Sequence, residues 1–180
     1  VAARCLAAAI LEVAMTLVDV HIESADNPVD VIETIASAND WTFERSADDE
    51  IILVVAGAWC GYRVAFSWME EVEALHVATA LDLAVSDDRR EEVVRALALV
   101  NEQLWIGHFD LWQEEGVIMY RNALLLAGRA EASPDQMQAL LDSAVEAADQ
   151  YDQVFQFVAV NGRDAGNALE TALFETVGEA

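Results

Sequence analysis

The sequence predicts an α+β fold in which an antiparallel sheet of about five to six strands packs against helices. Apolar residues recur at helical spacing near both ends of the chain, and short β-rich runs separated by turn residues occupy its middle. The 180 residues, 55% of them hydrophobic, are enough for one sizeable core. We therefore expect a single domain over residues 25–180, with elements in the order α-βββ(β)-α-ββ-α-α.

Residues 1–24 form an apolar N-terminal extension that we expect to be helical. Arg4 and Glu12 break its apolar runs well below the ~20 residues that a membrane span requires. No A-x-A-like cleavage site marks a signal peptide. The extension is expected to bury its apolar side on the domain or on a second subunit.

The domain is expected to begin with a helix and three strands. Asn27 can cap a helix whose first position is Pro28. Three β-rich runs follow, separated by the turn-like stretches SADDE and AWCG: WTFERS, IILVVAG and YRVAFSW. In the third run the aromatic residues alternate with smaller or charged ones, which predicts a strand with one face in the core.

The next run, ALHVATALDLAV, is mostly apolar at both odd and even positions. This pattern is typical of a strand that is covered on both sides. One of its faces consists largely of alanine, which would let a helix or a second subunit approach closely.

Three further helices are predicted. Ser86 is expected to cap a helix that begins at Asp87, and Ser133, Pro134 and Gln136 form a capping box at the start of another. The second of these helices carries an apolar seam at spacings of four and three, consisting of Met137, Leu141, Ala144, Ala148, Tyr151, Phe155 and Val158. The seam needs a surface along its whole length. A last helix is expected from about residue 165.

The stretch NEQLWIGHFDLWQEEG, residues 101–116, leads from a helix into a second hairpin. With a loop of two or four residues, Phe109 lies on the core face, whereas His108, Asp110 and Arg121 share the opposite face. A loop of three residues would reverse this assignment. The polar cluster could be a base with its orienting carboxylate, or an ion pair that fixes strand register. The second interpretation is favoured, because no nucleophile is adjacent and Arg121 would neutralise the carboxylate.

The charge of the chain excludes some partners. Nine basic and 33 acidic residues give a net charge of −24, which repels nucleic acid and anionic membranes. The same charge favours solubility or attraction to a basic partner protein.

No other motif indicates chemistry. Cys5 and Cys60 stand apart without a CxxC pair, so we expect a reducing, cytoplasmic compartment and a structural role for Cys60. The three histidines lack metal-ligand spacing, and no phosphate-binding glycine motif is present. We expect no metal, no cofactor and no catalytic residues.

The chain resembles the YbjN-like family of bacterial sensory transduction regulators over about residues 25–180. The resemblance is carried by WTFERSADDEI, WCGYRVAFSW, the stretch of residues 101–116 with MYRNALLLAG, and FQFV. It implies a fold similar to type III secretion chaperones, commonly homodimers that bind an extended segment of a partner protein along their sheet and helix surface. It supplies no catalytic residues. After FQFV the family has an aromatic residue and a Gly-Gly-Lys-like turn, whereas this chain has AVNGR, so no role is transferred to that corner.

Two functional hypotheses follow, and a third is weaker. The first is a non-enzymatic protein-binding or regulatory module that acts as a homodimer on an unknown protein partner. Its candidate interface residues are Trp105, His108, Asp110, Trp112, Arg121, Tyr151 and Phe155. The alternative is a small-ligand sensor with a pocket between the sheet and the C-terminal helices, lined by Trp68, Trp105 or Tyr151. The third is a hydrolase that uses Cys60 or His108.

Overall fold

The computed structural model describes residues 27–128 and 130–177, so the predicted extension over residues 1–24 lies outside the described part. Six strands and four α-helices follow one another within it. They are α1 (Pro28–Ala38), β1 (Thr42–Ala47), β2 (Glu50–Ala56), β3 (Gly61–Met69), the 3-10 turn η1 (Glu70–Val72), β4 (Ala74–Ala84), α2 (Arg90–Gln103), β5 (His108–Trp112), β6 (Val117–Leu125), α3 (Pro134–Ala159) and α4 (Ala165–Val177). The predicted element order is confirmed.

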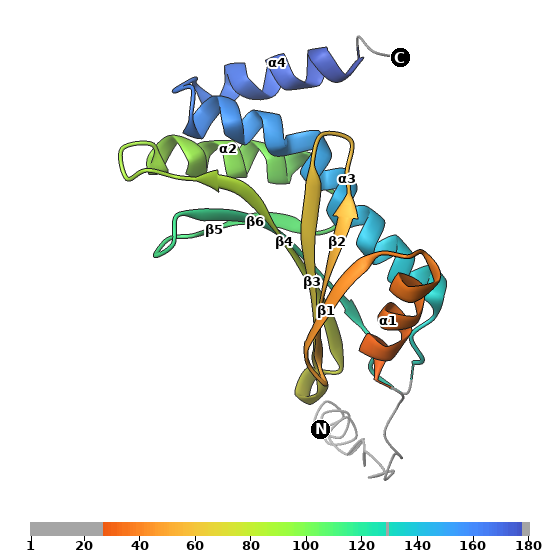
Figure 1. Ribbon diagram of the computed structural model, residues 1–180. Helices are drawn as coiled ribbons and strands as arrows, with labels where there is room; N and C mark the ends of the chain where they lie inside the picture. The colour runs from red at the N-terminus through yellow and green to blue at the C-terminus, as the bar shows by residue number, and fades with distance from the viewer. Residues whose placement is uncertain (1–26, 129, 178–180) are drawn as a thin grey trace, which may run out of the picture.

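The strands form one antiparallel sheet in the order β1-β2-β3-β4-β6-β5. The four described helices lie on one side of this sheet, with α3 running along it and α1 beside β1 (Figure 1). The sheet is strongly twisted. In Figure 1, β5 and β6 run roughly horizontally, whereas β1, β2 and β3 run roughly vertically. This is the predicted α+β fold, with one antiparallel sheet packed against helices.

The core lies between the sheet and the helices. Directly opposed residues of antiparallel strands share a face, and the helix-facing rows are almost fully buried. They include Ile51, Leu53, Val64, Phe66, Leu75, Val77, Phe109, Ile118 and Tyr120. The aromatic alternation predicted in the third strand is therefore confirmed.

Two helix starts follow their predicted caps, and one does not. The Asn27 side chain accepts a hydrogen bond from the Val29 amide, and the Ser133 capping box is complete. The helix predicted to begin at Asp87 begins instead at Arg90. The amide of Arg89 bonds to the carbonyl of Ser86, so the residues between them form a turn. Serine is common in turns as well as at helix N-caps, so Ser86 and the acidic residues after it are compatible with either structure.

The predicted seam of α3 is buried within the chain itself. All seven of its residues are buried, and α3 packs against β3, β4, β6 and the other three helices. The seam therefore gives no reason for a dimer.

The described residues cover only one of the two faces of β4 that were predicted to be covered. Its Leu75 face is covered by α3, but the alanine face has no described helix on it, and Ala80 is exposed. Any cover on that side must come from outside the described residues.

Candidate functional site

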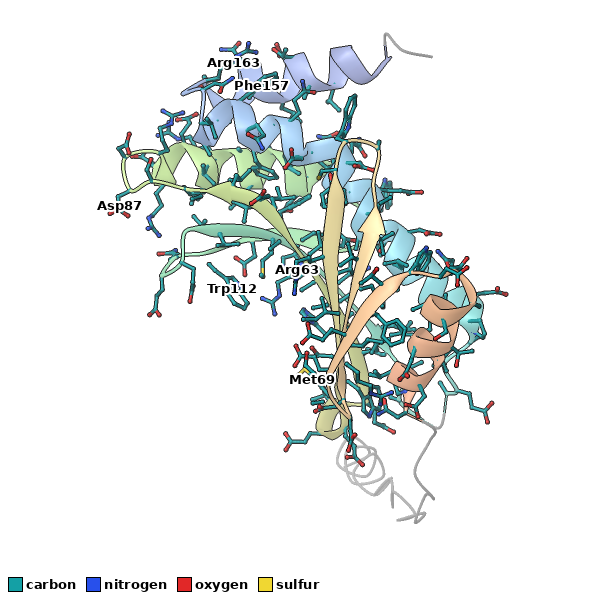
Figure 2. The ribbon with its side chains drawn as sticks, viewed as in Figure 1. Arg63, Met69, Asp87, Trp112, Phe157 and Arg163 are labelled. Carbon is teal, nitrogen blue, oxygen red and sulfur yellow. The ribbon has the colours of Figure 1, made fainter. Side chains whose placement is uncertain are left out.

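The side of the sheet away from the helices is an exposed surface, which we call the open face. In Figure 2 the labelled Arg63, Met69 and Trp112 lie on this side, with Arg63 and Trp112 in the angle between the two halves of the twisted sheet. Strand pairing places further side chains on it. The open face comprises Ile52, Val54, Arg63, Ala65, Met69, Ala74, His76, Ala78, His108, Asp110, Trp112, Met119, Arg121 and Leu125.

Large apolar side chains are exposed at both ends of the open face. Val54 is 42% and Trp112 45% exposed toward one end, whereas Met69 is 53% and Leu125 70% exposed at the other. Val54 pairs with Arg63, which is six residues before Met69 on β3, so the two ends are about 20 Å apart at ~3.3 Å per residue. Exposed apolar anchors of this kind are typical of protein interfaces.

A polar cluster lies between these ends. Arg121 Nη1 donates to Asp110 Oδ2 over 3.3 Å, and Arg121 Nε donates to His76 Nε2 over 3.2 Å. His108 is directly opposite Arg121 on β5. The predicted arrangement of Asp110, His108 and Arg121 on one face is confirmed, because the hairpin loop has four residues between Trp112 and Val117.

His76 is a member of this cluster that the sequence analysis missed. Its ring accepts a hydrogen bond from Arg121, which requires a neutral imidazole. Burial lowers the pKa of His76, and electrostatic interactions with Arg121 and His108 lower it further. The imidazole therefore acts as a hydrogen-bond acceptor that holds Arg121 in place.

This arrangement predicts that His76 makes the fold less stable in acid. Because the pKa of His76 is lower in the folded than in the unfolded chain, where it is about 6.5, the unfolded chain binds more protons as the pH falls through this value. His76→Gln keeps an acceptor for Arg121 but removes the titration. We expect the free energy of unfolding, measured by urea titration, to decrease less steeply below about pH 6.5 in the variant. Both proteins should show the same pH dependence above pH 7.5, and equal slopes below pH 6.5 would contradict the prediction.

The outer edge of β5 is closed by a side chain. Asn101 Nδ2 donates to the Phe109 carbonyl over 3.0 Å, and the Phe109 amide donates to Asn101 Oδ1 over 2.8 Å. The amide group of Asn101 thus replaces a neighbouring strand at this edge. The sequence analysis did not identify this role.

The tip of the β2–β3 hairpin is tied to α3 by Asp149. Its Oδ2 accepts from the Ala58 amide over 2.8 Å, and its Oδ1 accepts from the Tyr62 hydroxyl over 2.9 Å. Burial and the bond to Asp149 raise the pKa of Tyr62. A Cβ at Gly57 would lie 2.3 Å from the Tyr62 ring, so glycine is needed for this close approach.

The structure separates the seven predicted interface residues into three groups. His108, Asp110, Trp112 and Arg121 come together on the open face. Trp105 is 100% exposed in the segment between α2 and β5. Tyr151 and Phe155 are 2% and 0% exposed and pack with Phe109 in the core, so neither side chain contributes to the open face.

The remaining candidates lie apart from one another. Cys60 is an exposed free thiol in the turn between β2 and β3, whereas His108 begins β5.

Among residues 27–128 and 130–177, no group of three His, Cys, Asp or Glu side chains could hold a metal ion. Over the same ranges, no helix has both the length and the apolar character needed to cross a bilayer.

Comparison with known families identifies the class of protein. The fold is that of the type III secretion chaperone-like proteins, and the chain belongs to the YbjN family. The family model, described as "YbjN: Putative bacterial sensory transduction regulator", matches residues 28–157. No curated protein matches the chain.

Three solved structures are similar to this chain. The crystal structure of the ExsC–ExsE complex aligns with a TM-score of 0.55 and 15% identity, covering 77% of this chain and 98% of the other. YbjN from E. coli, described as "a putative transcription regulator", aligns with a TM-score of 0.50 and 10% identity, covering 84% and 97%. The HopA1–SchA chaperone–effector complex aligns at 0.47 with 11% identity, covering 66% and 87%. At 15% and 10% identity, the alignments with the ExsC–ExsE complex and with YbjN show similarity of fold alone.

Proposed function

We propose that this chain is a non-enzymatic regulatory module whose open face binds a partner protein and, when no partner is bound, a second copy of the chain as a homodimer. The observation that carries the proposal is the exposure of Val54, Trp112, Met69 and Leu125 on a sheet whose other face is sealed by helices. The similar fold of ExsC, crystallised in complex with ExsE, supports a protein as the partner.

The spacing of the anchors favours an extended partner segment. About six residues of extended chain span the ~20 Å between the two apolar ends of the open face. Arg121 lies between these ends and is 36% exposed. Its Nη2 can donate to a carboxylate or carbonyl group of the segment.

The dimer part of the proposal also depends on the open face, because the seam of α3 is used within the chain. A second copy and a partner would then compete for the same surface.

The small-ligand sensor has less support, because Tyr151 fills the core while Trp105 is fully exposed.

The test compares two valines of similar exposure. Val54→Asp places a charge on the open face, whereas Val94→Asp places one on α2, where Val94 is 48% exposed. We expect Val54→Asp to weaken self-association at least tenfold, about 1.4 kcal/mol, and Val94→Asp to leave it within twofold. Sedimentation velocity at micromolar concentrations gives both values.

A second measurement identifies the protein that binds the open face. A photo-crosslinking residue is placed at position 112 or position 94 in the source cells, and adducts are identified by mass spectrometry. Adducts at position 112 that are absent at position 94 support the proposal, as dimer or as complex. A wild-type chain that stays monomeric and gives no such adduct would rule it out.

A further inference from the structure

A small hollow lies on the helix side of the molecule, between the β2–β3 hairpin tip and α3. Its lining consists of Trp59, Asp152, Gln153 and Gln156, and its volume is about 200 Å³. This is smaller than the ~300–1,000 Å³ of sites for drug-sized ligands. It therefore suits one small group or one amino-acid side chain. Figure 1 shows the hairpin tip beside α3.

The shape of the hollow is fixed, because hydrogen bonds join its two walls, the β2–β3 hairpin tip and α3. Asp149, one turn before Asp152 on α3, accepts hydrogen bonds from Ala58 and Tyr62 on the hairpin. These bonds hold Trp59, next to Ala58, over the helix. Trp59 is nevertheless 67% exposed, so much of its indole surface is available to a ligand.

The carboxylate in the hollow has no cationic partner. The ion pairs among the described residues involve Arg45, Arg90, Arg95 and Arg121, and none reaches Asp152. Burial raises the pKa of Asp152, and the nearby charges of Asp149 and Asp82 raise it further, whereas a hydrogen bond with Gln156 opposes this. The negative charges here are thus uncompensated, and a cation would relieve their repulsion.

We propose that this hollow binds a guanidinium group. A planar cation stacks on the indole of Trp59 while its N–H groups donate to Asp152 and to a glutamine side-chain oxygen. Guanidinium suits this site better than ammonium, because it is flat, presents several donors in one plane and is more weakly hydrated. The group could belong to an arginine side chain of a basic partner or to a free small molecule.

The experiment is an NMR titration of the tryptophan indole N–H signals with ethylguanidinium chloride at constant ionic strength. The Trp59 signal is assigned with Trp59→Phe. We expect a saturable shift of this signal and none for Trp105, which is exposed elsewhere. Ethylammonium should bind at least threefold more weakly.

A matched pair of variants tests the carboxylate. Asp152→Asn should weaken ethylguanidinium binding at least tenfold, whereas Asp142→Asn, the same change at an exposed position of α3, should leave it within twofold. Asparagine preserves the shape of the side chain and removes a half-buried charge, so folding should not suffer. A linear drift shared by Trp59 and Trp105, or equal affinity in wild type and Asp152→Asn, would overturn the proposal.

A second arm distinguishes the two sources of the group. Tighter binding of a short peptide with one central arginine than of ethylguanidinium assigns the hollow to a protein partner, and weaker binding of the peptide assigns it to a free small molecule. Val54→Asp should titrate as wild type, because Val54 is on the opposite side of the sheet. Failure of this site and failure of the open-face proposal are therefore separate results.

Discussion

Replacing Phe109 with alanine should lower the free energy of unfolding by about 3–5 kcal/mol. Phe109 is 2% exposed, and its ring contacts those of Tyr120, Tyr151 and Phe155 at centroid distances of 5.5, 5.9 and 5.1 Å. Truncation loses the transfer free energy of the ring, leaves a cavity and removes three aromatic contacts at once. Urea denaturation followed by circular dichroism measures the change.

The control for Phe109 lies four residues earlier in the chain. Trp105 is larger but 100% exposed, so Trp105→Ala should change the free energy of unfolding by no more than about 0.5 kcal/mol. Similar losses from the two substitutions would mean that the aromatic cluster does not support the sheet as described.

Replacing Asn101 with alanine is expected to have the second largest effect. The substitution leaves the amide and the carbonyl of the nearly buried Phe109 without their partners, at a cost of about 1–3 kcal/mol for each group that water does not reach. Asn101→Asp keeps the acceptor for the Phe109 amide, but it places a carboxylate oxygen against the Phe109 carbonyl in place of the donor, so it should also destabilise the fold. Urea denaturation again measures these differences.

Asn39→Ala serves as the control for Asn101. Asn39 also donates its side-chain amide to a backbone carbonyl, that of Ile35, but it is exposed and water can replace the bond. We expect a change within about 0.5 kcal/mol. A loss at Asn39 equal to that at Asn101 would contradict the proposed closure of the β5 edge.

The sequence predicted those parts of the fold that depend on neighbouring residues. The caps at Asn27 and Ser133 and the alternation in YRVAFSW are local signals, and each identified its element correctly. Ser86 carried the same kind of signal as Ser133, yet it begins a turn, because local chemistry permits both outcomes.

The candidate site was predictable only in part. Asp110 and Arg121 were placed together because one hairpin contains them both. His76 lies on β4, and its contact with Arg121 depends on the order of strands in the sheet. Asn101 and Asp149 act on backbone and side-chain groups that only the folded chain brings near them.

Periodicity also could not tell a surface seam from a core seam. Tyr151 and Phe155 recur at the spacing expected of either, and the structure places both in the core. An exposed surface lies instead on the sheet, where the alternation in YRVAFSW had indicated an outward face.

The position of α3 in the chain has a consequence for synthesis. This helix packs on three strands and on the other three helices, but it is made after all six strands. Until residue 159 has left the ribosome, both faces of the sheet expose apolar side chains. Partly folded chains of this kind aggregate readily. A ribosome-bound chain that ends between β6 and Pro134 should therefore depend most on chaperones. Proteases should also degrade this chain faster than shorter or longer ones.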